Sequence, residues 1–292
     1  VREAALTGFG FGAGLYICGV SWVYVSLHEF GMMPMPLAAI ATLLFALFLA
    51  CFPALSGAAR VALGKMGTWG LLVVMPALWT ICEWILTWIF TGFPWMTIGY
   101  TQLESPIVGL APIVGVHGLS FVTAAIAGAL VVITTKANRA RAIGVIVIVA
   151  ALVGGNIAER IEWTTPRPQS IDVALIQGNI PQEIKFVPGR FESIVETYLR
   201  LIEQSHAQLI VLPETAIPQF FALLDQALLD RLRTLAVRRG GDIVFGVPVG
   251  DPRRDYYNSM VSIGTSETQA YSKSHLVPFG EFVPPAFGWI IT

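Results

Sequence analysis

The 292-residue sequence has few charged side chains. Only 13% of its residues are Asp, Glu, Lys or Arg, whereas soluble domains are usually near a quarter charged. A disordered chain needs low hydrophobicity and high net charge, and this chain is 55% hydrophobic with a net charge of −1. The balance of 18 basic against 19 acidic residues excludes a basic nucleic-acid-binding protein. The composition therefore argues against a wholly soluble protein, and we expect no nucleic-acid partner.

Cysteine and histidine are also scarce. Cys18, Cys51 and Cys82 are too few for a disulfide scaffold, and in apolar surroundings a free cysteine usually packs as a small hydrophobic side chain. The four histidines show no paired spacing, so a metal site is not expected. His275 alone lies in a motif of chemical interest, where a base or ligand role competes with an ordinary surface role.

The charges that are present are unevenly distributed. Residues 1–165 hold 13 of them and the shorter stretch 166–292 holds 24. A proline-containing joint at 164–168 separates the two parts. This division predicts a transmembrane helical domain over 1–165 and a water-soluble domain over 166–292.

Long apolar runs support the membrane interpretation, because a helix needs about 20 mainly apolar residues to cross the hydrocarbon core. The runs that qualify or nearly qualify as spans are 5–27, 37–59, 70–90, 107–134 and 142–158. The fourth contains Pro112 and Gly115, which predict a tilt or a break. Five core helices of a large soluble protein are the weaker alternative, because soluble helices need a polar face.

Basic residues occur in alternate loops, which predicts the orientation. The loops 28–36 and 91–106 contain no Lys or Arg. The basic segments contain Arg2, then Arg60 and Lys65, then Lys136, Arg139 and Arg141. By the positive-inside rule these face the cytoplasm, so we expect a multi-pass protein of the bacterial inner membrane with its soluble domain in the periplasm. The chain starts at Val1 and stops within an apolar run, so we expect it to be part of a longer protein.

The soluble part has the pattern of an α/β domain. Short β-rich runs cover 171–177, 208–212, 242–247 and 257–263, and apolar residues recur at helical spacing over 190–206 and 223–239. The order strand, helix, strand, helix, strand, strand predicts a layered α/β architecture.

Three polar motifs interrupt this pattern. Glu214 in LPETAIP follows a buried strand, where it suits a positioned general base or acid, although its position alone favours an ordinary turn carboxylate. Lys273 in YSKSHLVPFGEFVP could stabilise an oxyanion or remain a solvated lysine. Glu281 in the same motif could be a second acid or a cap. Gln177 opens the polar turn QGNIPQ, which is either a candidate substrate contact or an ordinary turn.

These motifs together resemble the apolipoprotein N-acyltransferase family, as do residues 22–26 (WVYVS) and 91–95 (TGFPW). The resemblance covers nearly the whole chain. It implies a multi-span α-helical membrane domain joined to a nitrilase-like α/β domain, an α-β-β-α sandwich of the carbon–nitrogen hydrolase superfamily.

The resemblance also implies a mechanism based on a Glu–Lys–Cys triad. Glu214 matches the general base, Lys273 the oxyanion-stabilising lysine, and Glu281 a supporting glutamate. The enzyme would take an acyl chain from a phospholipid, phosphatidylethanolamine, onto the Cys as a thioester. It would then pass the chain to the terminal amine of an S-diacylglyceryl-cysteine lipoprotein. A monomer without a cofactor is expected.

Two positions depart from the family pattern. No cysteine follows Cys82, whereas the family nucleophile lies beyond the lysine motif, so we expect it outside these 292 residues. Phe186 stands where the family is expected to have Trp. An aromatic side chain is kept, which is compatible with a lipid-contacting role or a lid role.

The membrane part has its own candidates for lipid contact. Glu83 lies in the third expected span, where an ionisable group is costly and indicates either function or a structural hydrogen bond between helices. Trp95 lies near an outer end, where it could anchor at the interface or line a lipid portal.

Other functions are weighed against the acyltransferase. A membrane-anchored nitrilase-type amidase would use the same triad with water as acceptor. A transporter or channel would need more polar residues within its spans. A catalytically inactive scaffold is suggested only by the missing cysteine.

Overall fold

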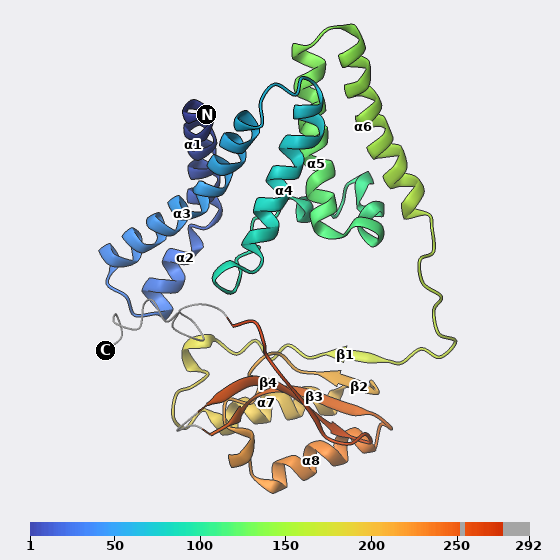
Figure 1. Ribbon diagram of the computed structural model, residues 1–292. Coiled ribbons are helices and arrows are strands. Elements are labelled where there is room, and N and C mark those ends of the chain that lie inside the picture. The colour runs from blue at the N-terminus through green and yellow to red at the C-terminus, as the bar shows by residue number, and fades with distance from the viewer. Residues whose placement is uncertain (252–254, 277–292) are drawn as a thin grey trace. The chain divides into compact units, whose positions relative to one another are not determined.

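The computed structural model describes residues 1–251 and 255–276. Its described residues divide into two compact units, Val1–Thr165 and Pro166–Leu276 (Figure 1). Each unit has its own hydrophobic core, so each is described by itself.

The first unit consists of helices. These are α1 (Arg2–Gly19), α2 (Trp22–Val25), a π-helical turn (Ser26–Phe30), α3 (Met35–Ala62), a second π-helical turn (Gly70–Val74), α4 (Met75–Leu86), α5 (Ala111–Thr135) and α6 (Asn138–Glu159). Short 3₁₀ segments lie at Ile89–Thr91, Ile98–Gln102 and Pro106–Leu110.

Several of these helices are long and apolar enough to cross a membrane. In the described residues they are α3, the stretch Pro106–Thr135 and α6, and a fourth results if α1 and the helical residues Trp22–Phe30, which bend by 49°, form one span. The apolar helix Gly70–Leu86 is shorter. The expected break in the fourth run occurs at Gly115, where φ is +65°. The expected membrane-type helical region is therefore confirmed.

The second unit is built on a five-stranded sheet in the order β1-β2-β3-β4-β5. Its strands are β1 (Val173–Leu175), β2 (Leu209–Val211), β3 (Asp242–Gly250), β4 (Tyr256–Gly264) and β5 (Gln269–Ser272). The first three are parallel and the last three antiparallel. All but β5 were expected from the sequence.

One face of this sheet is covered by α7 (Phe191–Gln204) and α8 (Gln226–Val237), as Figure 1 shows. Alternate strand residues such as Ile210, Ile243 and Phe245 pack against these helices and are almost fully buried. Residues on the opposite face, such as Leu175, are exposed. Within 166–251 and 255–276, one helix layer and one sheet layer are therefore present, which is half of the expected sandwich. The nitrilase-like α/β class is confirmed.

Candidate active site

Glu214 lies in a tight turn at the carboxyl end of β2. Its neighbour Thr215 has a φ of +48°, in the left-handed region. The amide of Ala216 donates to the carbonyl of Pro213 (3.2 Å), and the amide of Ile217 donates to the carbonyl of Gly246 in β3 (3.1 Å). The turn is therefore fixed to the neighbouring strand, and Glu214 stands at the sheet edge where α/β proteins bind ligands.

Gly246 allows this turn to lie against β3. A Cβ atom at this position would clash with the backbone nitrogen of Thr215 and the backbone oxygen of Pro213. Because these are backbone atoms, a side-chain rotation could not relieve the clash. Glycine at this position is thus a condition for the placement of Glu214.

Lys273 follows β5 directly and reaches the same site. Its Nζ lies 3.5 Å from Oε1 of Glu214, and the two side chains are 31% and 59% exposed. The structure therefore brings together two residues that are 59 positions apart in the chain. A carboxylate and an ammonium group beside each other can accept a proton and stabilise a developing negative charge.

Asn258 in β4 connects these two residues, and sequence reasoning missed it. Its side-chain amide donates to Oε1 of Glu214, and its Oδ1 accepts a hydrogen bond from Thr215 Oγ1 (3.4 Å). Its backbone oxygen accepts from the amide of Lys273 (2.8 Å). A polar residue next to an apolar strand pattern was the available signal.

Lys185 is a second cation beside Glu214, also missed. Its Nζ donates to the backbone carbonyl of Glu214 (3.1 Å). Burial lowers the pKa of Lys185, and the charge of Glu214 acts in the opposite direction. The next residue, Phe186, is 64% exposed. An exposed aromatic side chain therefore directly follows Lys185 in the sequence.

The remaining candidates of the soluble unit are less well defined. Gln177 is exposed in the loop after β1. His275 is exposed, with its Nδ1 3.2 Å from the hydroxyl of Ser274. Glu281 lies outside the described residues. Among the residues described, no three His, Cys, Asp or Glu side chains are grouped as metal ligands would be.

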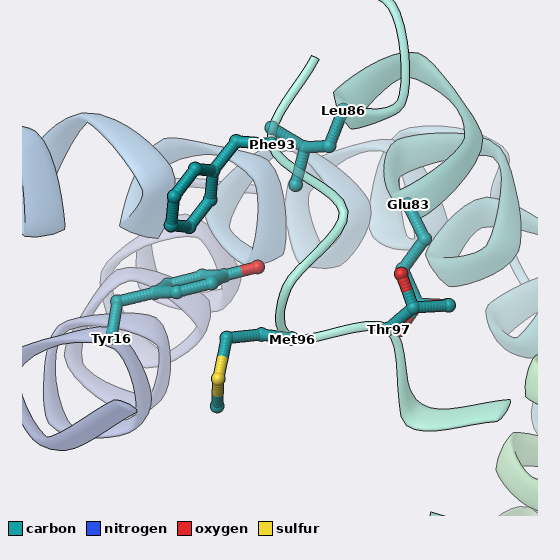
Figure 2. A pocket seen from close by; sticks show the side chains of 6 residues that line it. All are labelled: Tyr16, Glu83, Leu86, Phe93, Met96 and Thr97. Carbon is teal, nitrogen blue, oxygen red and sulfur yellow. The ribbon is translucent and has the colours of Figure 1, made fainter. Parts of the chain in front are cut away.

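Glu83 in α4 is almost fully buried, with 5% of its surface exposed. Its Oε1 accepts hydrogen bonds from the indole of Trp79 (2.8 Å) and the amide of Ile98 (3.0 Å). Its Oε2 has no partner among the described residues. Figure 2 shows the small pocket that it lines with Tyr16, Leu86, Phe93, Met96 and Thr97. Glu83 therefore accepts hydrogen bonds from its own helix and from the 3₁₀ segment Ile98–Gln102, and its role stays a prediction.

Two family models match the chain in succession. Residues 1–129 match the apolipoprotein N-acyltransferase N-terminal domain, and residues 172–288 match the carbon-nitrogen hydrolase domain. Proteins named apolipoprotein N-acyltransferase from Nitrosomonas europaea and Chromobacterium violaceum are each 40% identical over 99% of this chain. The chain belongs to the apolipoprotein N-acyltransferase family. A further relative of that name, from Methylococcus capsulatus, is 38% identical over 97% of the chain.

The chain spans 59%, 57% and 56% of the length of these three N-acyltransferase relatives. The range matched by the N-acyltransferase N-terminal domain includes Glu83 and Trp95. The range matched by the hydrolase domain includes Glu214, Lys273 and Glu281. The relatives do not favour the amidase alternative, since they are named as acyltransferases. The roles of the individual site residues stay predictions.

Proposed function

We propose that this chain is the larger part of a membrane enzyme that transfers a fatty acyl chain from a phospholipid to the terminal amine of S-diacylglyceryl-cysteine in apolipoproteins. The contact between Glu214 and Lys273 carries the proposal, because it pairs a base with a cation at a sheet edge. The names of the relatives supply the substrate class. The apolar helices of the first unit supply a means of reaching lipid.

Glu214 is proposed as the general base and Lys273 as the oxyanion-stabilising residue. Both Lys273 and Asn258 contact Oε1 of Glu214, and the Glu214 carboxylate would take the proton of a thiol. The thiolate would attack the ester carbonyl of the phospholipid, forming a thioester, and the proton held by Glu214 would pass to the oxygen of the leaving lysophospholipid. The lipoprotein amine would then attack the thioester, forming the amide and returning the thiol.

The thiol is proposed to lie outside these 292 residues. Cys18, Cys51 and Cys82 belong to α1, α3 and α4 in the helical unit, and no cysteine follows them in the sequence. The greater length of the relatives leaves room for such a residue. Glu281 is proposed to support the base.

Trp95 and Phe186, both exposed aromatic side chains, are proposed to contact acyl chains. Gln177 is proposed at the edge of the substrate site, on the loop after β1.

We further propose phosphatidylethanolamine as donor, a monomeric enzyme in the bacterial inner membrane, and a periplasmic catalytic domain. The alternating basic loops support this orientation.

The test is intact-mass spectrometry of the full-length protein after incubation with phosphatidylethanolamine and no acceptor. We expect one acyl mass per protein, removed by hydroxylamine as a thioester would be. The Glu214→Gln variant should remain folded and lack the adduct. Normal adduct formation by this variant would refute the base role, and no adduct on the wild type would refute the acyltransferase proposal.

A further inference from the structure

The segment that joins α4 to the 3₁₀ helix Ile98–Gln102 is fixed at its first end by a turn back onto α4. The amide of Phe93 donates to the carbonyl of Leu86, the last residue of α4 (2.6 Å). Gly92, with a φ of +95°, allows this return, since a Cβ there would clash with the carbonyl oxygen of Thr87. The chain therefore leaves α4 and returns to it within seven positions.

The second end is fixed by two buried side chains. The first amides of a helix have no acceptor within the helix itself. Here the amide of Ile98 donates to Oε1 of Glu83 (3.0 Å), and the amide of Gly99 donates to Oγ of Ser120 (3.0 Å). Glu83 and Ser120 are 5% and 0% exposed and belong to different helices, α4 and α5.

The backbone at Gly99 lies directly on α5. A Cβ at this position would clash with the carbonyl oxygen of Val116. Because water cannot reach the amides of Ile98 and Gly99 as readily here as at an exposed helix start, loss of either acceptor would leave a buried donor unpaired. Glu83 and Ser120 thus act as a two-residue clamp, which we call the Glu83–Ser120 clamp.

Between the two fixed ends the segment carries Phe93 and Trp95, which form an aromatic cluster with Trp22 of α2. The rings of Trp22 and Phe93 stack with centroids 6.3 Å apart, and those of Trp22 and Trp95 meet edge to face at 5.3 Å. Trp95 is nevertheless 66% exposed. The cluster is therefore ordered by its neighbours while it presents apolar surface.

We propose that Glu83 and Ser120 are positioning residues that hold this aromatic cluster in the shape that receives an acyl chain of the phospholipid donor. This inference rests on the proposed acyltransferase function. Neither residue contacts the lipid. Each acts through a backbone amide, and the amide fixes the segment that carries Phe93 and Trp95.

In this arrangement Glu83 acts as a hydrogen-bond acceptor, a role that does not need its negative charge. One oxygen, Oε1, accepts both the Trp79 indole and the Ile98 amide. The carbonyl oxygen of a glutamine can accept the same two bonds, whereas a leucine can accept neither. Glutamine should therefore rescue the function of the clamp, and a role in proton transfer or cation binding would not allow that rescue.

The direct test is amide hydrogen exchange of the full-length protein in lipid nanodiscs, followed on peptides that contain residues 96–102. Glu83→Leu should speed exchange at Ile98, and Ser120→Ala at Gly99, by about tenfold each, as expected for one lost hydrogen bond. Glu83→Gln should exchange as the wild type does. Thr80→Val is the matched control, because the Thr80 hydroxyl is buried on the same helix without a partner among the described residues.

The kinetic test uses the same variants with phosphatidylethanolamine as donor. Glu83→Leu and Ser120→Ala should raise the donor KM by about fivefold, with kcat within about twofold, because ordering of the binding surface is lost and the chemistry is not. Unchanged exchange at both amides, or a Glu83→Gln variant as impaired as Glu83→Leu, would overturn the inference. If Glu83→Leu does not fold, Ser120→Ala decides.

Failure of the proposed function is distinguishable from failure of the clamp. A wild-type protein that forms no acyl adduct would refute the former, and the exchange pattern would still report on the two amides. Protected amides in the wild type that lose protection in the variants, with an unchanged donor KM, would overturn the link between the clamp and lipid.

Discussion

The two units each place one glutamate at a defined position, and the two glutamates have opposite surroundings. Glu83 in the helical unit is 5% exposed and is bonded by an indole and a backbone amide. The side chain of Glu214 in the α/β unit is 59% exposed and lies beside the ammonium of Lys273. A buried acceptor of neutral donors can fix the backbone, whereas an exposed carboxylate beside a cation remains able to exchange a proton with a substrate.

The largest expected effect comes from making the same substitution in both units. Glu214→Gln should lower the rate of acyl transfer by about 10³-fold, the contribution typical of a general base. Glu83→Gln should lower it by less than about threefold, since both hydrogen bonds are retained. Steady-state kinetics on the full-length variants, with equal thermal unfolding midpoints as control, measures both. Comparable losses in the two variants would break the comparison.

The next effect concerns the two lysines beside Glu214. Lys273→Met should reduce kcat by about 10²-fold, the loss typical of one missing oxyanion donor. Lys185→Met removes a hydrogen bond to the Glu214 backbone and a positive charge near Glu214, and a loss of about tenfold or less is expected. The ratio of the two kcat values tests which lysine takes part in the chemistry, and a larger loss at Lys185 would reverse the assignment.

A smaller effect concerns packing under Glu214. Gly246→Ala should destabilise the α/β unit by about 1–3 kcal/mol, because the added methyl group meets only backbone atoms. Gly10→Ala in the helical unit is the matched control, since a Cβ there has open space around it. Urea or thermal unfolding of both variants measures the difference. Equal stabilities would show that the turn at Glu214 can move away from β3.

The smallest effect is a pH dependence at the start of β3. The backbone amide of Ser266 donates to Asp242 (2.9 Å) and, with further hydrogen bonds, holds the pKa of this carboxyl below its usual value. Its stabilising contribution is therefore present above the unfolded-state pKa of about 4 and is lost as the pH falls through the lower folded value.

Thermal unfolding between about pH 6 and pH 3 checks this dependence. The wild type should lose more stability over that interval than Asp242→Asn, which has no carboxyl to protonate. Parallel curves for the two proteins would contradict the assignment.

The sequence predicted the helices and strands whose apolar residues form a clear local pattern. The apolar spacing over 190–206 predicted α7, because it reports one buried helix face, and the short β-rich run 257–263 predicted β4. Glu214 and Lys273 were found separately, each by its motif. Five spans, the orientation and the roles of Gln177, Phe186 and Glu281 stay predictions.

The contacts that join these residues were not predictable in the same way. Asn258 reaches Glu214 across 44 positions and Ile98 reaches Glu83 across 15, and both contacts depend on strand register or helix packing. A local pattern contains no information on such pairings. The short strand β5 was missed for a different reason: all four of its residues are exposed, so it shows no pattern of a buried face.

The pairing of β5 with β4 determines where Lys273 lies relative to Glu214. Ser272 lies opposite Ser259, and the next residue along, Lys273, bonds to Asn258. A slip of one residue would turn the lysine to the other side of the sheet, while leaving the covered face of helices and strands untouched. The length of the connection at 265–268 therefore sets the position of Lys273 relative to Glu214. A one-residue insertion there would give a folded protein that lacks the contact between Lys273 and Glu214.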